Sequence, residues 1–140
     1  MRKYLPLLLA LLMLACNRTE HNSASDHTYA MLERVAELNA GGDKPGALAL
    51  ADSALLMHPA DTTRCWLLSE KAVTLVDMGR MADAVGVAQG AYRLAEKLHD
   101  VDAMLNLRGT MGIAYRRLGK TDSALVQYKE GIQMALAEHN

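Results

Sequence analysis

The chain has 140 residues, and its 15 Lys and Arg side chains nearly balance its 16 Asp and Glu side chains, which gives a formal net charge of −1 at pH 7. This length suits one domain with one core. The charge balance provides no basic stripe for a phosphate backbone, so the composition argues against a nucleic-acid-binding protein.

The first fifteen residues have the pattern of an export signal. Two basic residues precede an almost unbroken apolar run at positions 5–14, and the small residue Ala15 stands directly before Cys16. A transmembrane helix needs about 20 apolar residues, so this run is too short to span a bilayer. We therefore expect residues 1–15 to be a removable signal peptide.

The end of this run, Met13-Leu14-Ala15-Cys16, resembles the lipobox of bacterial lipoproteins. In that family the cysteine is acylated through its sulfur and becomes the new N-terminus, which implies lipidation at Cys16 and a polar tether at 16–26. The family usually has Leu three residues before the cysteine and a small residue two before it, where this chain has Met13 and Leu14. The alternatives are an ordinary secretory signal cut near Ala15 and a coincidental apolar start.

The resemblance also implies a location for the protein and a chemical state for its second cysteine, Cys65. Asn17 after the cysteine, in place of aspartate, favours a bacterial outer membrane protein facing the periplasm by analogy with the family. If Cys16 carries lipid, Cys65 has no partner for an intrachain disulfide. Cys65 lies beside Trp66 in an apolar segment, and we expect it to be a small buried residue and not a reactive thiol.

An internal repeat organises the rest of the chain, here assigned as one domain at 27–140. Gly42, Gly79 and Gly119 are 37 and then 40 residues apart, and each is followed five residues later by alanine. The same register continues nine and twelve residues after each glycine. The positions that define it are Ala47, Ala51 and Ala54, then Ala84, Ala88 and Ala91, then Ala124, Tyr128 and Gly131. The units run over about 27–60, 61–98 and 101–138.

Apolar residues recur at spacings of three and four on both sides of each glycine, so each unit is predicted to be two amphipathic helices around a glycine turn. Strands are not expected, because apolar and polar residues hardly alternate. Asp43 and Asp61 stand where N-caps are needed, Pro45 falls in a first turn, and Pro59 ends the helix before it. The predicted helices cover about 27–40, 44–57, 62–78, 81–97, 101–118 and 121–138.

This pattern resembles the tetratricopeptide repeat, and the third unit carries the resemblance best. The family's Trp, Leu-Gly, Tyr, Ala, Phe and Pro positions fall on Arg108, Met111-Gly112, Tyr115, Ala124, Tyr128 and Leu136, and four of these seven positions match in kind. The resemblance implies an all-α fold, a short right-handed superhelical stack of three hairpins. A generic helical bundle is the alternative.

The resemblance further implies that the first helix of each hairpin lines a concave groove for another protein or peptide. The predicted groove residues are Tyr29, Leu32, Trp66, Val73, Ile113, Arg116 and Arg117, with Asn39, Ser69, Asp77 and Asn106 on the same face. An apolar side chain of the partner is expected near Trp66 and a carboxylate near Arg116 and Arg117. Alternatively, Trp66 is simply buried and the two arginines are a solvated helix end.

The sequence contains no nucleophile elbow, phosphate-binding loop or dinucleotide motif, and its five histidines lack metal-ligand spacing. We therefore expect no catalytic residue, metal or cofactor. The last predicted helix is apolar on more than one face, which favours self-association, a partner or further chain at that end. The leading hypothesis is a lipid-anchored interaction module of the cell envelope; the alternative is the N-terminal sensory region of a longer membrane-bound regulator.

Overall fold

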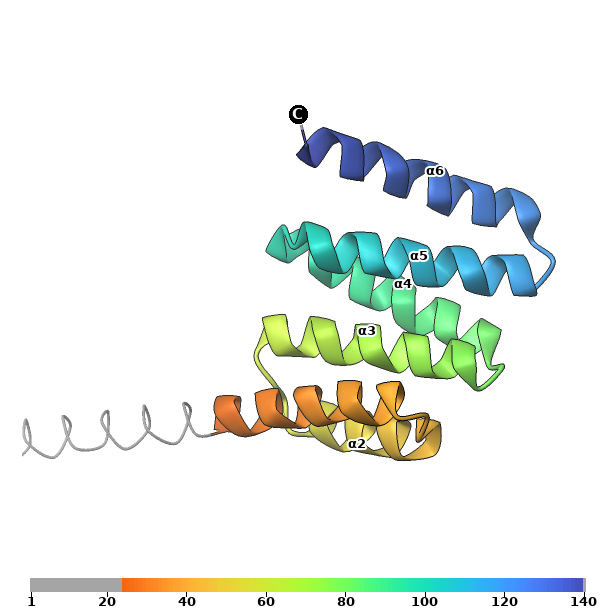
Figure 1. Ribbon diagram of the computed structural model, residues 1–140. Helices are drawn as coiled ribbons and strands as arrows, with labels where there is room; N and C mark the ends of the chain where they lie inside the picture. The colour runs from red at the N-terminus through yellow and green to blue at the C-terminus, as the bar shows by residue number, and fades with distance from the viewer. Residues whose placement is uncertain (1–23, 140) are drawn as a thin grey trace, which may run out of the picture.

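The computed structural model describes residues 24–139, and all regular structure in this range is helical (Figure 1). The predicted signal peptide, Cys16 and the tether as far as residue 23 lie outside the described residues. The first helix covers 24–40, so three residues assigned to the tether are helical. The other helices are α2 (Lys44–Leu56), α3 (Asp61–Asp77), α4 (Met81–Leu98), α5 (Val101–Arg117) and α6 (Thr121–Glu138).

The six helices form three consecutive hairpins, which confirms the predicted all-helical stack. The first helix, α3 and α5 follow one another in one layer, with α2 and α4 behind them and α6 at the end farthest from α2 (Figure 1). Helix α4 packs against both α3 and α5, and α3 also contacts α5 directly. Apart from the start of the first helix, every predicted boundary lies within one residue of the observed one. No helix in residues 24–139 combines the length and apolarity needed to cross a bilayer.

Three equivalent glycine bends join the two helices of each hairpin. Gly42, Gly79 and Gly119 have φ angles of 86°, 79° and 75°, in the left-handed region where a side chain with a β-carbon is strained. The amide of the residue after each glycine donates to the carbonyl five residues before it. These bonds are Asp43 to Leu38 at 2.9 Å, Arg80 to Leu75 at 2.8 Å and Lys120 to Tyr115 at 2.9 Å. The three bends therefore share one helix-ending motif.

The predicted start of α2 is as expected, whereas the predicted cap of α3 is wrong. Asp43 caps α2 by accepting the Gly46 amide at 3.0 Å, and Pro45 lies in the first turn. Asp61 is not the N-cap of α3, because the extended backbone at Ala60 places the cap one residue earlier. Asp61 is instead the first helical residue, where its charge favours the helix dipole and where it pairs with Arg64 at 3.4 Å.

The alanine register is the centre of the core. The three register positions are fully buried in the first two hairpins. In the third hairpin Ala124 is buried, whereas Tyr128 and Gly131 are half-buried. Leu67, Leu75 and Leu107 are the largest buried side chains of the described residues, so small residues on one helix receive a leucine from another. This arrangement lets helix axes approach closely while leaving little empty space.

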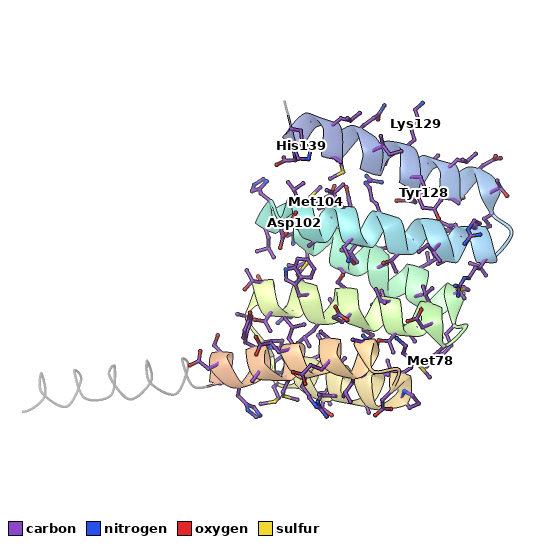
Figure 2. The ribbon with its side chains drawn as sticks, viewed as in Figure 1. Met78, Asp102, Met104, Tyr128, Lys129 and His139 are labelled. Carbon is purple, nitrogen blue, oxygen red and sulfur yellow. The ribbon has the colours of Figure 1, made fainter. Side chains whose placement is uncertain are left out.

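The contact between α5 and α6 depends on Gly112. A β-carbon built on Gly112 would lie 2.3 Å from the Cε1 atom of Tyr128, and Figure 2 shows Tyr128 between the two helices. By contrast, a β-carbon at Gly109 on the same helix meets nothing within 4 Å. Gly112 is therefore required by packing, while Gly109 is not.

Arg108 connects three helices from the position at which the tetratricopeptide signature has tryptophan. Its guanidinium lies 4.6 Å from the centre of the Tyr92 ring of α4 and pairs with Glu130 of α6 at 2.5 Å. It also donates to Gln127 at 3.0 Å. Only 14% of the Arg108 side chain is exposed, so this charge is largely desolvated and its partners are needed to offset that cost.

The Gly112 contact yields a stability prediction. Gly112→Ala should lower the free energy of unfolding by about 1 to 3 kcal/mol, because the new methyl group collides with Tyr128. Gly109→Ala is the matched control and should raise it by roughly 0.5 to 1 kcal/mol, since it gains helix propensity without a clash. Urea unfolding followed by circular dichroism measures both, and equal effects of the two variants would refute the packing role of Gly112.

Cys65 yields a second prediction. The thiol is fully buried, and its Sγ lies 3.7 Å from the Ala91 carbonyl oxygen. Burial raises the pKa of the Cys65 thiol above its ordinary value, and the Asp100 carboxylate raises this pKa further. Ionisation of Cys65 therefore does not affect the free energy of unfolding below the thiol pKa of the unfolded chain. Above it, the free energy of unfolding falls as the pH rises toward the raised native pKa, because only the unfolded chain readily loses the proton. A thiol reagent should therefore label Cys65 at neutral pH only at the rate of unfolding, and rapid labelling of the folded chain would contradict this account.

Candidate functional site

A pocket of about 310 Å³ lies between the first helix and α3, where the sequence predicts one end of the binding groove. Tyr29 and Leu32 of the first helix and Trp66 of α3 line it, and all three were predicted groove residues. Glu33, Ala36 and Glu70 complete the lining, and the two carboxylates were not among the predicted groove residues. Tyr29 is 54% exposed, so its ring is available to a partner.

Trp66 is held in a defined position. Its Nε1 donates to Asp100 Oδ2 at 3.1 Å, while Asp100 Oδ1 accepts the Ala103 amide at 2.9 Å as the N-cap of α5. Part of the indole packs on the core cluster around Cys65, and another part lines the pocket. Trp66 is thus half-buried, so neither the fully buried alternative nor a freely exposed ring describes it. Its N–H is already satisfied, which leaves the ring surface for a partner.

Polar side chains fix the first helix to α3 behind the pocket. Asn39 donates from Nδ2 to Glu70 Oε2 at 2.8 Å, and the Thr74 hydroxyl lies 2.8 Å from Asn39 Oδ1. Between α3 and α5, Ser69 donates to Asn106 Oδ1 at 2.8 Å. Asn39 and Ser69 are buried. These predicted groove residues are therefore used within the fold, where they set the spacing of the helices that form the pocket.

Val73 and Ile113 lie outside this pocket but in the same repeat register. Val73 is 37 residues after Ala36, and Ile113 is 40 residues after Val73, so the three occupy equivalent positions on the first helix, α3 and α5. Val73 is half-buried and Ile113 is 37% exposed. We call the surface that carries the pocket, Val73 and Ile113 the binding face.

The two predicted arginines differ from each other. Arg117 donates from Nη1 to the Val76 carbonyl oxygen at 3.3 Å, near the end of α3, so it satisfies a terminal carbonyl of that helix. Arg116 is exposed in the last turn of α5 and has no ion pair among the described residues. Neither residue lines the pocket, so they do not form one site with Trp66.

The arrangement is suited to binding. The pocket combines aromatic and aliphatic surface with two carboxylates, Glu33 and Glu70, and Glu70 uses only Oε2 for Asn39. An apolar side chain next to a cationic group matches this chemistry. In residues 24–139 no three His, Cys, Asp or Glu side chains come together in a way that would hold a metal ion.

Comparisons with known proteins agree with this architecture. A family model for the tetratricopeptide repeat matches residues 63–137, which is more than half of the 140-residue chain and covers the second and third hairpins. No curated protein matched the chain, and no solved structure matched it. Proteins built from this repeat generally bind other proteins and are not catalysts. The family match agrees with the equivalent glycine bends and the shared alanine register of the hairpins. The chain belongs to the tetratricopeptide repeat family.

Proposed function

We propose that this protein is a lipid-anchored, non-catalytic interaction module of the bacterial cell envelope, which holds another envelope protein through the binding face. The observation that carries the proposal is the pocket between the first helix and α3, in which Tyr29, Leu32 and Trp66 meet next to Glu33 and Glu70. A rigid aromatic group in a partly desolvated pocket is a common centre of binding energy.

The pocket also defines the partner's chemistry. A volume of about 310 Å³ accommodates one or two side chains, not a domain. We propose that an extended peptide or a helix of the partner places an apolar side chain against Trp66 and a Lys or Arg next to Glu33 and Glu70. The partner then continues along Val73 and Ile113. A partner carboxylate near Arg116 is compatible with this path, since that side chain is exposed.

The proposed anchor depends on the residues before the described part of the chain. A short apolar run followed by Met13-Leu14-Ala15-Cys16 is the basis for acylation at Cys16, and Asn17 is the basis for an outer membrane location facing the periplasm. Each buried methylene of an acyl chain adds about 0.8 kcal/mol to membrane affinity, so several chains would make the anchor effectively permanent. Anchoring would keep the binding face near other envelope proteins and raise their effective concentration.

Tyr29→Ala tests the binding face. The ring is more than half exposed, so its removal should leave the free energy of unfolding almost unchanged while raising the dissociation constant for the partner at least about 10-fold. Partners are first captured by crosslinking in intact cells, and affinities are then followed by the fluorescence of Trp66, the single tryptophan.

Leu56→Ala is the matched control, because Leu56 is an apolar residue on α2 that is 80% exposed and lies outside the pocket. It should leave the captured partners and their affinities unchanged. If Tyr29→Ala and the unmodified chain capture the same partners and bind them equally well, the binding face is not the site that holds the partner.

Intact-mass measurement of the chain purified from bacterial membranes tests the anchor. The proposal predicts a chain that begins at Cys16 and carries the added mass of acyl groups, together with a Cys16→Ser variant that lacks this mass and leaves the membrane fraction. A chain cut near Ala15 without added mass would show an ordinary secretory signal and contradict lipidation.

A further inference from the structure

Each of the first two hairpins has a groove that the next hairpin fills with a helix. In the first hairpin, Ala51 and Ala54 form one buried cluster with Leu67 of α3. In the second, Ala88, Ala91 and Ala95 form one with Leu107 of α5. All of these side chains are fully buried. The occupant in both cases is an amphipathic helix that places a leucine among small residues.

The corresponding groove of the third hairpin is open. Forty residues after Ala88, Ala91 and Ala95 stand Tyr128, Gly131 and Ala135, and these three line a groove of about 370 Å³ between α5 and α6. Leu105, Gly109 and Ile132 add further apolar lining. No helix among residues 24–139 lies in this groove. The repeat has thus placed a helix-binding site at this end of the stack, which we call the terminal groove.

The apolar surface continues from the terminal groove onto the outer side of α6. Leu125, Ile132 and Leu136 are 59%, 62% and 61% exposed, and their spacings of seven and four residues place them on one stripe of the helix. Lys129 borders this stripe on the outer side of α6 (Figure 2). A contiguous exposed apolar stripe of this kind marks an interaction surface.

The opposite end of the stack does not fit this surface. The residues of the first helix that correspond in register to Ala103, Leu107 and Ala114 of α5 are Asp26, Ala30 and Glu37, each 77 positions earlier. All three are exposed, and Glu37 pairs with Arg34 on the same helix at 2.7 Å. This end is therefore polar and solvated. A head-to-tail contact would press charged residues into an apolar groove, which is unfavourable.

We propose that the terminal groove is occupied by α6 of a second copy of this chain, in a closed two-fold dimer. Helix α6 has 18 residues and the two helices that fill the equivalent grooves have 17, so its length matches. Leu125 lies near its start and Leu136 near its end, so an antiparallel copy sets apolar residues against apolar residues. Under a two-fold axis, α6 of each copy lies in the terminal groove of the other copy. One contact then covers both grooves and both apolar stripes. This contact is separate from the binding face.

Sedimentation equilibrium of the full chain, with any detergent density-matched, tests the proposal. The expected result is a monomer–dimer equilibrium that saturates at two copies. The double variant Ile132→Glu and Leu136→Glu should raise the dissociation constant at least about 100-fold, because the two-fold axis brings four carboxylates into one apolar contact. Both side chains are exposed in the single chain, so circular dichroism and urea unfolding should show the variant to be folded.

The matched control is Leu56→Glu, which introduces the same charge at an exposed apolar position on α2 and should leave the dimer unchanged. Three results would overturn the proposal: a monomer up to about 100 µM, continued growth beyond two copies, or a dissociation constant unaffected by the double variant. A monomer whose terminal groove binds a helix of a different protein would likewise overturn it.

Discussion

The structure depends on the close approach of helices at small side chains. Alanine recurs five, nine and twelve residues after the glycine bend in the first two hairpins, and each of these alanines is fully buried. No hairpin covers its own apolar side, so each of the first two is stabilised by a leucine of the next hairpin. The glycine bends fix the register, since all three close with the same backbone hydrogen bond. Stability, curvature and binding surfaces all follow from this repeated contact.

The candidate site is a consequence of the same stacking. The pocket forms because the first helix and α3 lie side by side at a spacing set by Asn39, Glu70 and Thr74. The cap of α5 then reaches back to hold Trp66, since Asp100 accepts both the Ala103 amide and the indole N–H. The pocket is therefore lined by two helices and supported by the cap of a third, one from each hairpin. It is pre-organised, which lowers the entropy cost of binding.

Much of the fold was predictable because the signals are local. The glycine bends, the cap at Asp43 and the three- and four-residue periodicity need only neighbouring residues, and the helix boundaries follow from them. Contacts between helices were not predictable, because they depend on which side chains the stacking brings together. The roles of Arg108 between α4 and α6, of Arg117 at the end of α3 and of Glu70 in the pocket belong to this class. Asp61 was misplaced because the backbone before a helix, and not residue type alone, decides which residue is the cap.

The central claim is that small residues in a common register let each hairpin receive the next, and Ala88→Leu tests it most directly. Ala88 is fully buried in the groove that receives α5. The added atoms should push α4 and α5 apart and lower the free energy of unfolding by about 1 to 3 kcal/mol. Ala82, exposed at the start of the same helix, supplies the matched Ala82→Leu control, which should change it by less than about 0.5 kcal/mol. Urea unfolding curves in which Ala88→Leu is as stable as the control would contradict the account.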